Sequence, residues 1–339
     1  MRLFLSIFVT MFLVVGSVRA EITVGAAGQV TSFTAAQQTA TATPNSVIRY
    51  IDDSVTGEQL TVGAVNTSLT LELDGHTWGA PNNASYCLNV GAGMVGTFTC
   101  NNGTLSRAVT ESGALNRLVN LAPGALGVVN LKRLKFVIDQ SFPVNTALVQ
   151  VTGAATSSTV IERCESVTLG GGALFNFGLT HAGTATVKSS RCSGSSFAGI
   201  RSVAVLPVSI LYCDILDNAK GIIETTPNVI MNTIFAGNTI DRDITGTGST
   251  SDFTYNAYTN SNADPGTGSI TITAARTFCD QNNYWISPAS LTLNAGVSID
   301  GVTGVDLGLN GVKQGSGGIL GMGCNPYSLA LCGGYGVGK

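Results

Sequence analysis

Short β-branched runs separated by Asn, Asp and Gly recur along this chain at an interval of about twenty residues. The clearest copy sets residues 207–218, PVSILYCDILDN, over residues 227–238, PNVIMNTIFAGN. Proline, isoleucine, a large apolar residue and asparagine keep their positions in both copies. Because one such unit cannot bury its apolar face alone, the pattern predicts a solenoid in which successive coils stack.

A further rung precedes this pair. Residues 187–192 and 197–200 align with residues 208–213 and 219–222, with cysteine, glycine and isoleucine in step. Asn, Asp and Gly tolerate left-handed backbone angles and let one strand bend sharply into the next. Each coil is therefore predicted to hold two or three short strands, which pair edge to edge with the neighbouring coils at about 4.8 Å.

The amino-terminal part of the pattern predicts a cap. Residues 32–41 read as a short helix with little charge, and residues 46–51 and 69–73 alternate like strands. A helix at this place would cover the open end of the first coil. The predicted fold class is all-β, a parallel β-helix with a short N-terminal capping helix.

The first residues predict a signal peptide. Arg2 is followed by the apolar run 3–15, and Val18 and Ala20 occupy the small-residue cleavage positions. No later segment offers the roughly twenty unbroken apolar residues of a membrane span. We expect an exported protein, secreted or at the cell surface, without a transmembrane segment in its mature form. The expected organisation is 1–20 signal peptide, 21–255 capped β-helix, and 256–339 β-helix end with an irregular, disulfide-bearing tail.

All eight cysteines follow the signal segment. An exported chain meets an oxidising compartment, so disulfides are expected rather than a metal site, and the chain has no Cys-x-x-Cys pair. Local bridges are predicted from Cys87 to Cys100 and from Cys324 to Cys332.

Three more cysteines, Cys164, Cys192 and Cys213, are spaced like one position in successive coils. Stacking by one strand separation would bring their α-carbons within disulfide range, but three residues cannot all pair with one another. Either one of them pairs with Cys279, or the three are buried apolar fillers.

The distribution of charged residues argues against some classes of binding partner. The 17 basic and 20 acidic residues are scattered and give a net charge of −3. This distribution lacks the basic footprint of a nucleic-acid-binding protein and any polybasic membrane patch. Only 11% of the residues are charged and 42 are glycines, which suits many short turns. We expect one long solenoid, a monomer, that does not bind nucleic acid.

The segments 33–38 and 47–51 and the rungs from Val187 to Asn238 are similar to those of the secreted right-handed parallel β-helix proteins of the pectin-lyase-like superfamily. Residues 278–308 also resemble the module that often ends bacterial surface β-helix proteins. The resemblance implies a right-handed β-helix outside the cell, and it specifies the fold much better than an activity.

The superfamily includes lyases and hydrolases of acidic polysaccharides. β-Elimination from a uronate needs its carboxylate neutralised, by Ca²⁺ or by basic side chains, and a base near the leaving proton. Hydrolysis needs two carboxylates that flank the glycosidic bond. Of the signatures of the superfamily's polygalacturonases, only a paired aspartate occurs here, Asp52-Asp53, and we interpret it as a solvated turn.

Aligning the three cysteines stacks two columns of candidate residues. The first column is Arg163, Arg191 and Tyr212, and the second, next but one, is Glu165, Ser193 and Asp214. If the cysteines point inward, both columns point outward, with Asp217 nearby. The arginines and carboxylates are then candidate catalytic residues, and Tyr212 and Asp217 could help to bind an acidic sugar or Ca²⁺. The other interpretation is a ladder of exposed inter-rung ion pairs, worth little to stability.

His181 lies in a glycine-rich loop, where it either overhangs a binding groove or is merely solvated. Exposed threonines and asparagines suggest a second class of function, in which the outer walls face sugars, ice or other cells. Segments such as Ser68-Leu-Thr70 recur irregularly, which gives a flat ice-binding array little support.

We therefore expect a non-catalytic cell-surface or extracellular protein with carbohydrate-facing walls, whose role is binding, adhesion or structure. Its expected partner is a polysaccharide or cell-surface glycan, and no cofactor is expected. The alternative is a polysaccharide lyase or glycoside hydrolase that acts on an acidic polysaccharide, with Ca²⁺ as a cofactor if it is a lyase.

Overall fold

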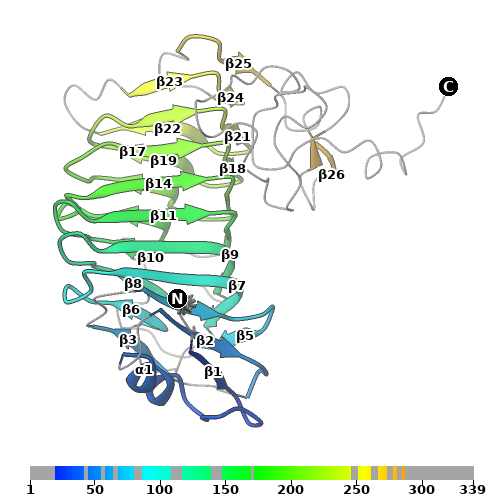
Figure 1. The fold of residues 1–339 in the computed structure, drawn as a ribbon. Helices are drawn as coiled ribbons and strands as arrows, with labels where there is room; N and C mark the ends of the chain where they lie inside the picture. Colours follow the sequence, from blue (N-terminus) through cyan, green and yellow to red (C-terminus); the bar gives the residue numbers. More distant parts are fainter. Residues whose placement is uncertain are drawn as a thin grey trace, which may run out of the picture.

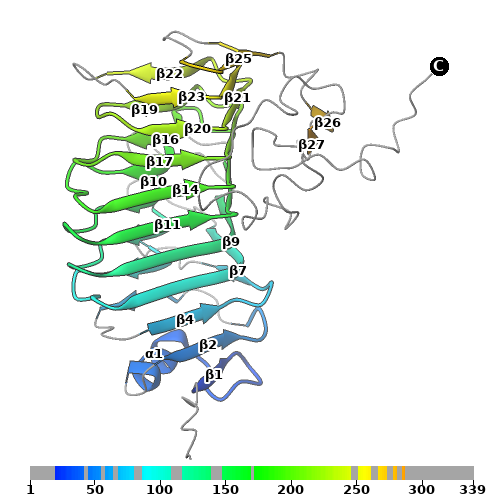
Figure 2. The same cartoon turned by 45° about the horizontal axis from the view of Figure 1, so that its top comes forward.

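The structure is a computed structural model of the chain. It describes residues 20–41, 45–54, 58–63, 68–79, 86–107, 117–138, 147–168, 172–245, 251–260, 266–272, 278–280 and 285–286. Short strands stack along one axis in parallel coils, and helix α1 (Phe33–Thr41) lies at the amino-terminal end (Figure 1, Figure 2). The predicted all-β fold, a right-handed parallel β-helix with a capping helix, is confirmed. Residues 1–19 of the predicted signal peptide, which spans residues 1–20, lie outside the described residues, as does the predicted Cys324–Cys332 bridge.

Each coil has three walls. Wall I contains β1 (Glu21–Val24), β2 (Ser46–Tyr50), β4 (Ser68–Glu72), β7 (Thr97–Arg107), β9 (Val128–Ile138), β11 (Ser158–Glu162), β14 (Thr184–Lys188), β17 (Val208–Leu211), β20 (Val229–Met231) and β23 (Asp252–Thr254). Wall II contains β5 (Thr77–Gly79), the second halves of β7 and β9, β12 (Glu165–Thr168), β15 (Arg191–Ser193), β18 (Asp214–Leu216), β21 (Ile234–Ala236), β24 (Ala257–Tyr258) and β25 (Ile270–Thr271). Because β7 and β9 run through both, walls I and II form one bent sheet of 17 strands.

Wall III is a separate sheet of eight strands. Its members are β3 (Leu60–Val62), β6 (Leu88–Val90), β8 (Val119–Leu121), β10 (Ala147–Val151), β13 (Ala173–Phe177), β16 (Ala198–Ser202), β19 (Lys220–Glu224) and β22 (Ile240–Ile244). A short antiparallel pair, β26 (Phe278–Asp280) with β27 (Trp285–Ile286), follows outside these walls. Parallel pairing continues through β24 and β25, so the coil extends past residue 255.

One left-handed residue per coil makes the corner between walls I and II. This corner column is Asn102, Arg133, Arg163, Ser189, Tyr212, Asn232 and Tyr255, all with φ between +48° and +60°. The left-handed region costs most non-glycine residues about 1–2 kcal/mol. Arginine and tyrosine accept it here because the strands on both sides of the corner are held in register by the neighbouring coils.

Helix α1 covers the first coil as predicted. Its N-terminus is capped twice: Ser32 Oγ accepts a hydrogen bond from the backbone N–H of Ala35 at 3.0 Å, and the Glu58 carboxylate accepts those of Phe33 and Thr34. The Phe33 ring packs 4.5 Å from the Trp78 ring, centroid to centroid. The helix thereby closes the apolar interior at this end.

The cysteines are core residues rather than cross-links. Cys100 is a free, buried thiol in wall I, whereas Cys87 directly precedes β6 in wall III, so the predicted Cys87–Cys100 bridge does not form. Cys164, Cys192 and Cys213 are also free and buried, as the filler interpretation requires. Burial raises the pKa of the Cys164 and Cys213 thiols to about 12.

The repeated asparagine is an internal ladder. Asn218 Nδ2 donates to Asn238 Oδ1 at 3.1 Å, and Asn238 Nδ2 donates to the backbone carbonyl of Ile215 at 2.8 Å. Both asparagines are buried. Their side-chain amides provide hydrogen-bond partners for buried polar groups at the turns. The asparagine that repeats in the sequence is therefore explained by the fold.

Candidate functional site

The predicted columns are displaced in the middle rung. Arg163 and Tyr212 do share the corner column, but their partner there is Ser189. Arg191 instead lies in register with Glu165 below it and Asp214 above it. The prediction was wrong because Cys164 and Cys213 directly follow their corner residues, whereas Cys192 stands two places further along.

Because of this displacement, the candidate residues form a ladder of ion pairs on wall II. Lys135 Nζ lies 3.6 Å from Glu165 Oε2, Arg191 Nη1 lies 3.3 Å from Glu165 Oε1, and Arg191 Nη2 lies 3.8 Å from Asp214 Oδ2. The ladder therefore alternates cation and anion through four successive coils. Of the two interpretations of these residues, the ion-pair ladder is the one that the geometry supports.

The inner part of this ladder is buried rather than exposed. The Asp214 side chain is 0% exposed and that of Arg191 is 6% exposed. Tyr212 is also buried, and Asp217 is exposed in the turn at the far end of β18. The structure thus brings Glu165, Arg191 and Asp214 together, but it does not place Tyr212 and Asp217 on an open face beside them.

His181 is buried, contrary to both expectations for the loop. Within the part of the chain that the structure describes, neither of its ring nitrogens has a hydrogen-bond partner, and its ring centroid lies 6.1 Å from that of Phe177. Burial lowers the pKa of this imidazole and favours its neutral form. An uncharged histidine packed against an aromatic ring is a core residue here, not one that overhangs a groove.

The side chains of the paired aspartates, Asp52 and Asp53, form hydrogen bonds with residues of neighbouring turns. Asp52 accepts a hydrogen bond from the backbone N–H of Ala26 at 2.9 Å, and the Ser54 hydroxyl and N–H lower the pKa of its carboxyl. Asp53 Oδ1 accepts the backbone N–H of Thr77 at 2.9 Å and lies 3.2 Å from His76 Nδ1. Both carboxylates are engaged by neighbouring turns, as the interpretation of this pair as a turn predicts.

Wall I carries a regular, mostly polar surface in the part of the chain that the structure describes. Two columns of small side chains alternate with the buried positions of the strands and stack from coil to coil. The members of this hydroxyl wall are Ser68, Thr97, Val128, Ser158 and Thr184 in one column and Thr70, Thr99, Asn130, Val160, Thr186 and Ser209 in the other. All are at least partly exposed and none is charged.

The sequence concealed this wall because the coils differ in length. Successive members of its first column, from Ser68 to Thr184, are 29, 31, 30 and 26 residues apart. In space they are one strand separation apart, about 4.8 Å, and the two columns lie about 6.8 Å apart along each strand. Eight hydroxyl-bearing side chains therefore stack in two columns, interrupted by Val128, Asn130 and Val160, and no fixed period in the sequence reveals them.

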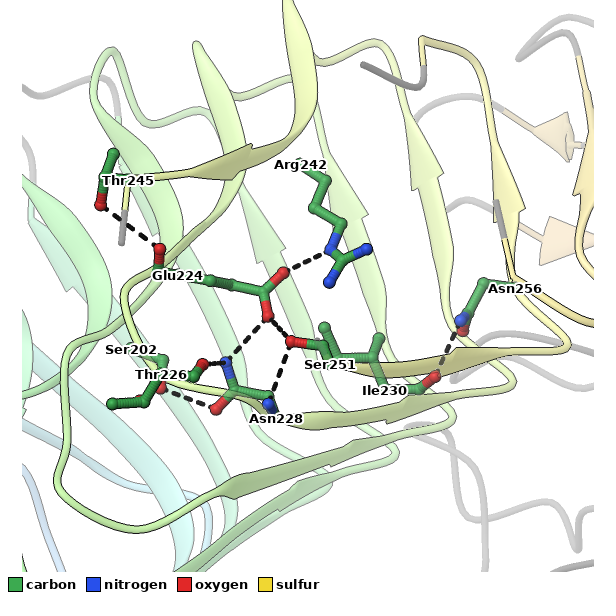
Figure 3. Close-up of polar contacts among 9 residues, drawn as sticks. All are labelled: Ser202, Glu224, Thr226, Asn228, Ile230, Arg242, Thr245, Ser251 and Asn256. Atoms are coloured by element: carbon green, nitrogen blue, oxygen red, sulfur yellow. Dashed lines mark hydrogen bonds and ion pairs between the residues drawn. The ribbon is translucent and has the colours of Figure 1, made fainter. Parts of the chain in front are cut away.

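A second polar cluster closes the interior near the carboxyl-terminal coils (Figure 3). Arg242 Nε donates to Glu224 Oε1 at 2.5 Å, and its guanidinium lies 4.8 Å from the centre of the Phe253 ring. Asn228 Nδ2 and the Ser251 hydroxyl both donate to Glu224 Oε2. Arg242 takes the place of an aliphatic residue of the preceding coil, because it pairs in register with Ile222, whereas Glu224 pairs with Ser202.

This cluster is structural. The Glu224 side chain is 0% exposed, so no solute reaches its carboxylate without local unfolding. Its charge is balanced by one guanidinium, and its second oxygen is occupied by two neutral donors. Sequence reasoning missed it, since only the register shows that Arg242 points inward.

Neither a metal site nor a membrane helix is present in the described part of the chain. There, no group of three or more His, Cys, Asp or Glu side chains is arranged to hold a metal ion, and no helix is long and apolar enough to cross a bilayer. No protein-family model, no curated protein and no solved structure was found to match this chain.

Proposed function

We propose that this protein is an exported, non-catalytic β-helix that binds carbohydrate through its outer walls, at the cell surface or outside the cell. The observation that carries the proposal is the hydroxyl wall. Hydroxyl and amide groups both donate and accept hydrogen bonds, as sugar hydroxyls do. Because the wall is held by a continuous parallel sheet, little conformational freedom is lost when a flat polymer chain lies on it.

The environment of the predicted catalytic residues supports the non-catalytic part of the proposal. Elimination would need an accessible cation to neutralise the uronate, and Arg191 is buried between two carboxylates. Its charge is already balanced by Glu165 and Asp214. Incubation with acidic polysaccharides, with and without Ca²⁺, is therefore expected to give no unsaturated products.

Binding to a panel of neutral and acidic polysaccharides tests the proposal. The test variant replaces three wall residues, Thr70→Val, Thr99→Val and Thr186→Val, which removes hydroxyls while keeping side-chain volume and strand propensity. Each lost hydrogen bond is worth about 1 kcal/mol, so affinity is expected to fall on the order of a hundredfold.

The matched control is Thr61→Val, because Thr61 is exposed on β3 in wall III, away from the hydroxyl wall. This control should bind as the unmodified chain does. Binding by the triple variant within a factor of two of the unmodified chain would overturn the assignment of the wall.

A further inference from the structure

The exposed large apolar side chains of the described residues gather along one edge of the coil stack. Six of them are 38–73% exposed, and five of these lie in the turns that lead from wall III to wall I. The sixth, Ile244, ends β22, just before the next such connection. In Figure 2 this is the edge from which the arrows of wall I start. We call these residues the apolar ridge: Val95, Leu126, Leu179, Val205, Leu206 and Ile244.

The ridge is continuous and rigid because its turns belong to successive coils and are bonded to one another. Six of these turns are described in full: 91–96, 122–127, 152–157, 178–183, 203–207 and 225–228. Backbone N–H groups of one turn donate to carbonyls of the turn before it, Gly124 to Met94 at 3.0 Å and Val205 to His181 at 2.9 Å. One strand separation per coil, about 4.8 Å, gives these six turns a length of about 24 Å.

One member of the ridge keeps its exposed side chain in a costly backbone conformation. The turn places Leu126 at φ = +66°, in the left-handed region, as it does Thr156 in the next coil. This conformation costs leucine about 1–2 kcal/mol, whereas glycine adopts it freely and asparagine often does. Leu126 is 71% exposed, so its side chain adds little to the packing of the coil. An apolar side chain held outward at such a position indicates a contact outside this chain.

The six turns also form a strip without charge. They contain no Asp, Glu, Lys or Arg. His181 is the one titratable residue in them, and its burial lowers the pKa of the imidazole and favours the neutral form. The whole chain has a net charge of −3, so two copies that met through charged faces would repel each other. Contact through this strip desolvates no charge, and a second copy of the chain therefore matches it.

The size of the strip fits an interface between two proteins. About twenty residues of the six turns are at least partly exposed, which approaches the 20–30 residues that each partner contributes to an interface of standard size. All of these residues are Gly, Ala, Val, Leu, Pro or Thr. Small and apolar side chains on bonded turns can be brought together closely, and few rotamers are lost when they are.

The composition of the strip argues against two other occupants. Membrane-surface sites use Trp, Tyr, Lys and Arg at the level of the lipid head groups, and the six turns contain none of these residues. Sugars with apolar faces pack on aromatic rings, and the turns contain no Phe, Tyr or Trp. Aliphatic side chains with no charge around them are instead typical of the buried centre of a homodimer interface.

We propose that the apolar ridge is the interface of a homodimer, in which the ridges of two copies pack against each other about a twofold axis. The proposal goes beyond the proposed function, and it replaces the monomer expected from the sequence. In such an interface every residue occurs twice, so each leucine of the ridge is buried in both copies.

Sedimentation velocity of the purified protein tests the proposal, between about 1 and 100 µM, because interfaces of standard size dissociate at micromolar concentration or below. The unmodified protein is expected to sediment as a dimer at the upper end of this range. The ridge variant carries Leu126→Asn, Leu179→Asn and Leu206→Asn, three changes at exposed positions, and asparagine tolerates the backbone of residue 126. Its dissociation constant should rise at least a hundredfold, since each substitution acts twice.

The matched control makes the same kind of change on wall I: Val160→Asn, Val229→Asn and Met231→Asn. These three apolar residues are partly exposed and lie outside the six turns. The control should dimerise as the unmodified protein does. Circular dichroism of each variant shows that the β-helix is intact before sedimentation is compared.

A monomer throughout the concentration range would overturn the proposal. A dissociation constant of the ridge variant within threefold of the original would also overturn it, because the interface would then lie elsewhere, and so would an equal loss in the control. Flotation with phosphatidylcholine vesicles tests the other occupant: a monomer that floats with the vesicles, and stops doing so in the ridge variant, would make the ridge a lipid-binding surface. The assays contain no glycan, so their outcome is independent of the proposed function.

Discussion

Replacement of Glu224 by glutamine would leave a buried guanidinium without a charged partner. The side chains of Glu224 and Arg242 are 0% and 6% exposed, and they meet at 2.5 Å. Removing one member of such a pair typically costs about 3–5 kcal/mol, because the other charge stays desolvated. Glutamine keeps the size of the side chain and one acceptor oxygen, so the loss reports on the charge rather than on a cavity. We expect Glu224→Gln to destabilise the carboxyl-terminal coils by this amount.

A matched control pair joins the same two strands, β19 and β22. Lys220 and Asp243 form an ion pair at 2.6 Å, with 34% and 24% of their side chains exposed. Asp243→Asn is therefore expected to cost less than about 1 kcal/mol. The double variant Glu224→Gln, Arg242→Met removes both charges, and it should recover a large part of the stability that the single variant loses.

Stacked repeats unfold locally, so a single global transition is not a suitable measure. Urea denaturation followed by circular dichroism should be combined with native-state hydrogen exchange of the amides in β19 and β22, which reports the stability of these coils directly. The reasoning fails if exchange in these two strands is accelerated no more by Glu224→Gln than by Asp243→Asn, or if the double variant is less stable than the single one.

Three further predictions follow from buried and capping groups. Because burial raises the pKa of Cys164 and Cys213 to about 12, a thiol reagent at pH 8 should leave both unmodified in the folded protein and react after denaturation in urea. The lowered pKa of His181 means that protons bind the unfolded chain more readily, so stability should be constant above the ordinary pKa of histidine and fall as the pH drops below it. His181→Leu should remove that dependence when melting temperatures at pH 7 and pH 5 are compared. Glu58→Ala deletes a cap of α1 and should cost about 1 kcal/mol, visible as faster hydrogen exchange of the Phe33 and Thr34 amides, with Glu21→Ala as an exposed control.

The sequence was sufficient for the architecture where the coils are short and similar. The offset of 20 residues between Ile210 and Ile230 is the one that the repeat predicted, and the match of Ile200 with Ile222 was also right. The predicted register was wrong for the pair of coils that precedes this one. Alignment on cysteine set Val187 over Val208, whereas the structure pairs Val187 with Ile210. A shift of two residues keeps the side chains on the same face, so the apolar pattern could not expose it.

That small shift decided the interpretation of the candidate site. With the predicted register, Arg163 and Arg191 stack at an outer corner as two like charges. With the observed register, Arg191 lies between Glu165 and Asp214, and opposite charges alternate along the wall. Electrostatics could have distinguished the two, because unlike charges directly opposite each other favour a register and like charges disfavour it.

The turns between walls III and I indicate the register of the coils, which the apolar pattern of the strands does not. Four of these turns have six residues each: 91–96, 122–127, 152–157 and 178–183, all rich in glycine and other small residues. Each is followed at once by a member of the first column of the hydroxyl wall. The variation in coil length instead falls mostly between walls II and III, where the connection shrinks from eleven residues after Arg107 to three after Leu216. An alignment anchored on the constant turn, rather than on cysteine or on a fixed period, would have stacked the serines and threonines of wall I. The chain thus varies the length of its coils between walls II and III while it keeps the two columns of wall I in register, as the proposed binding surface on wall I requires.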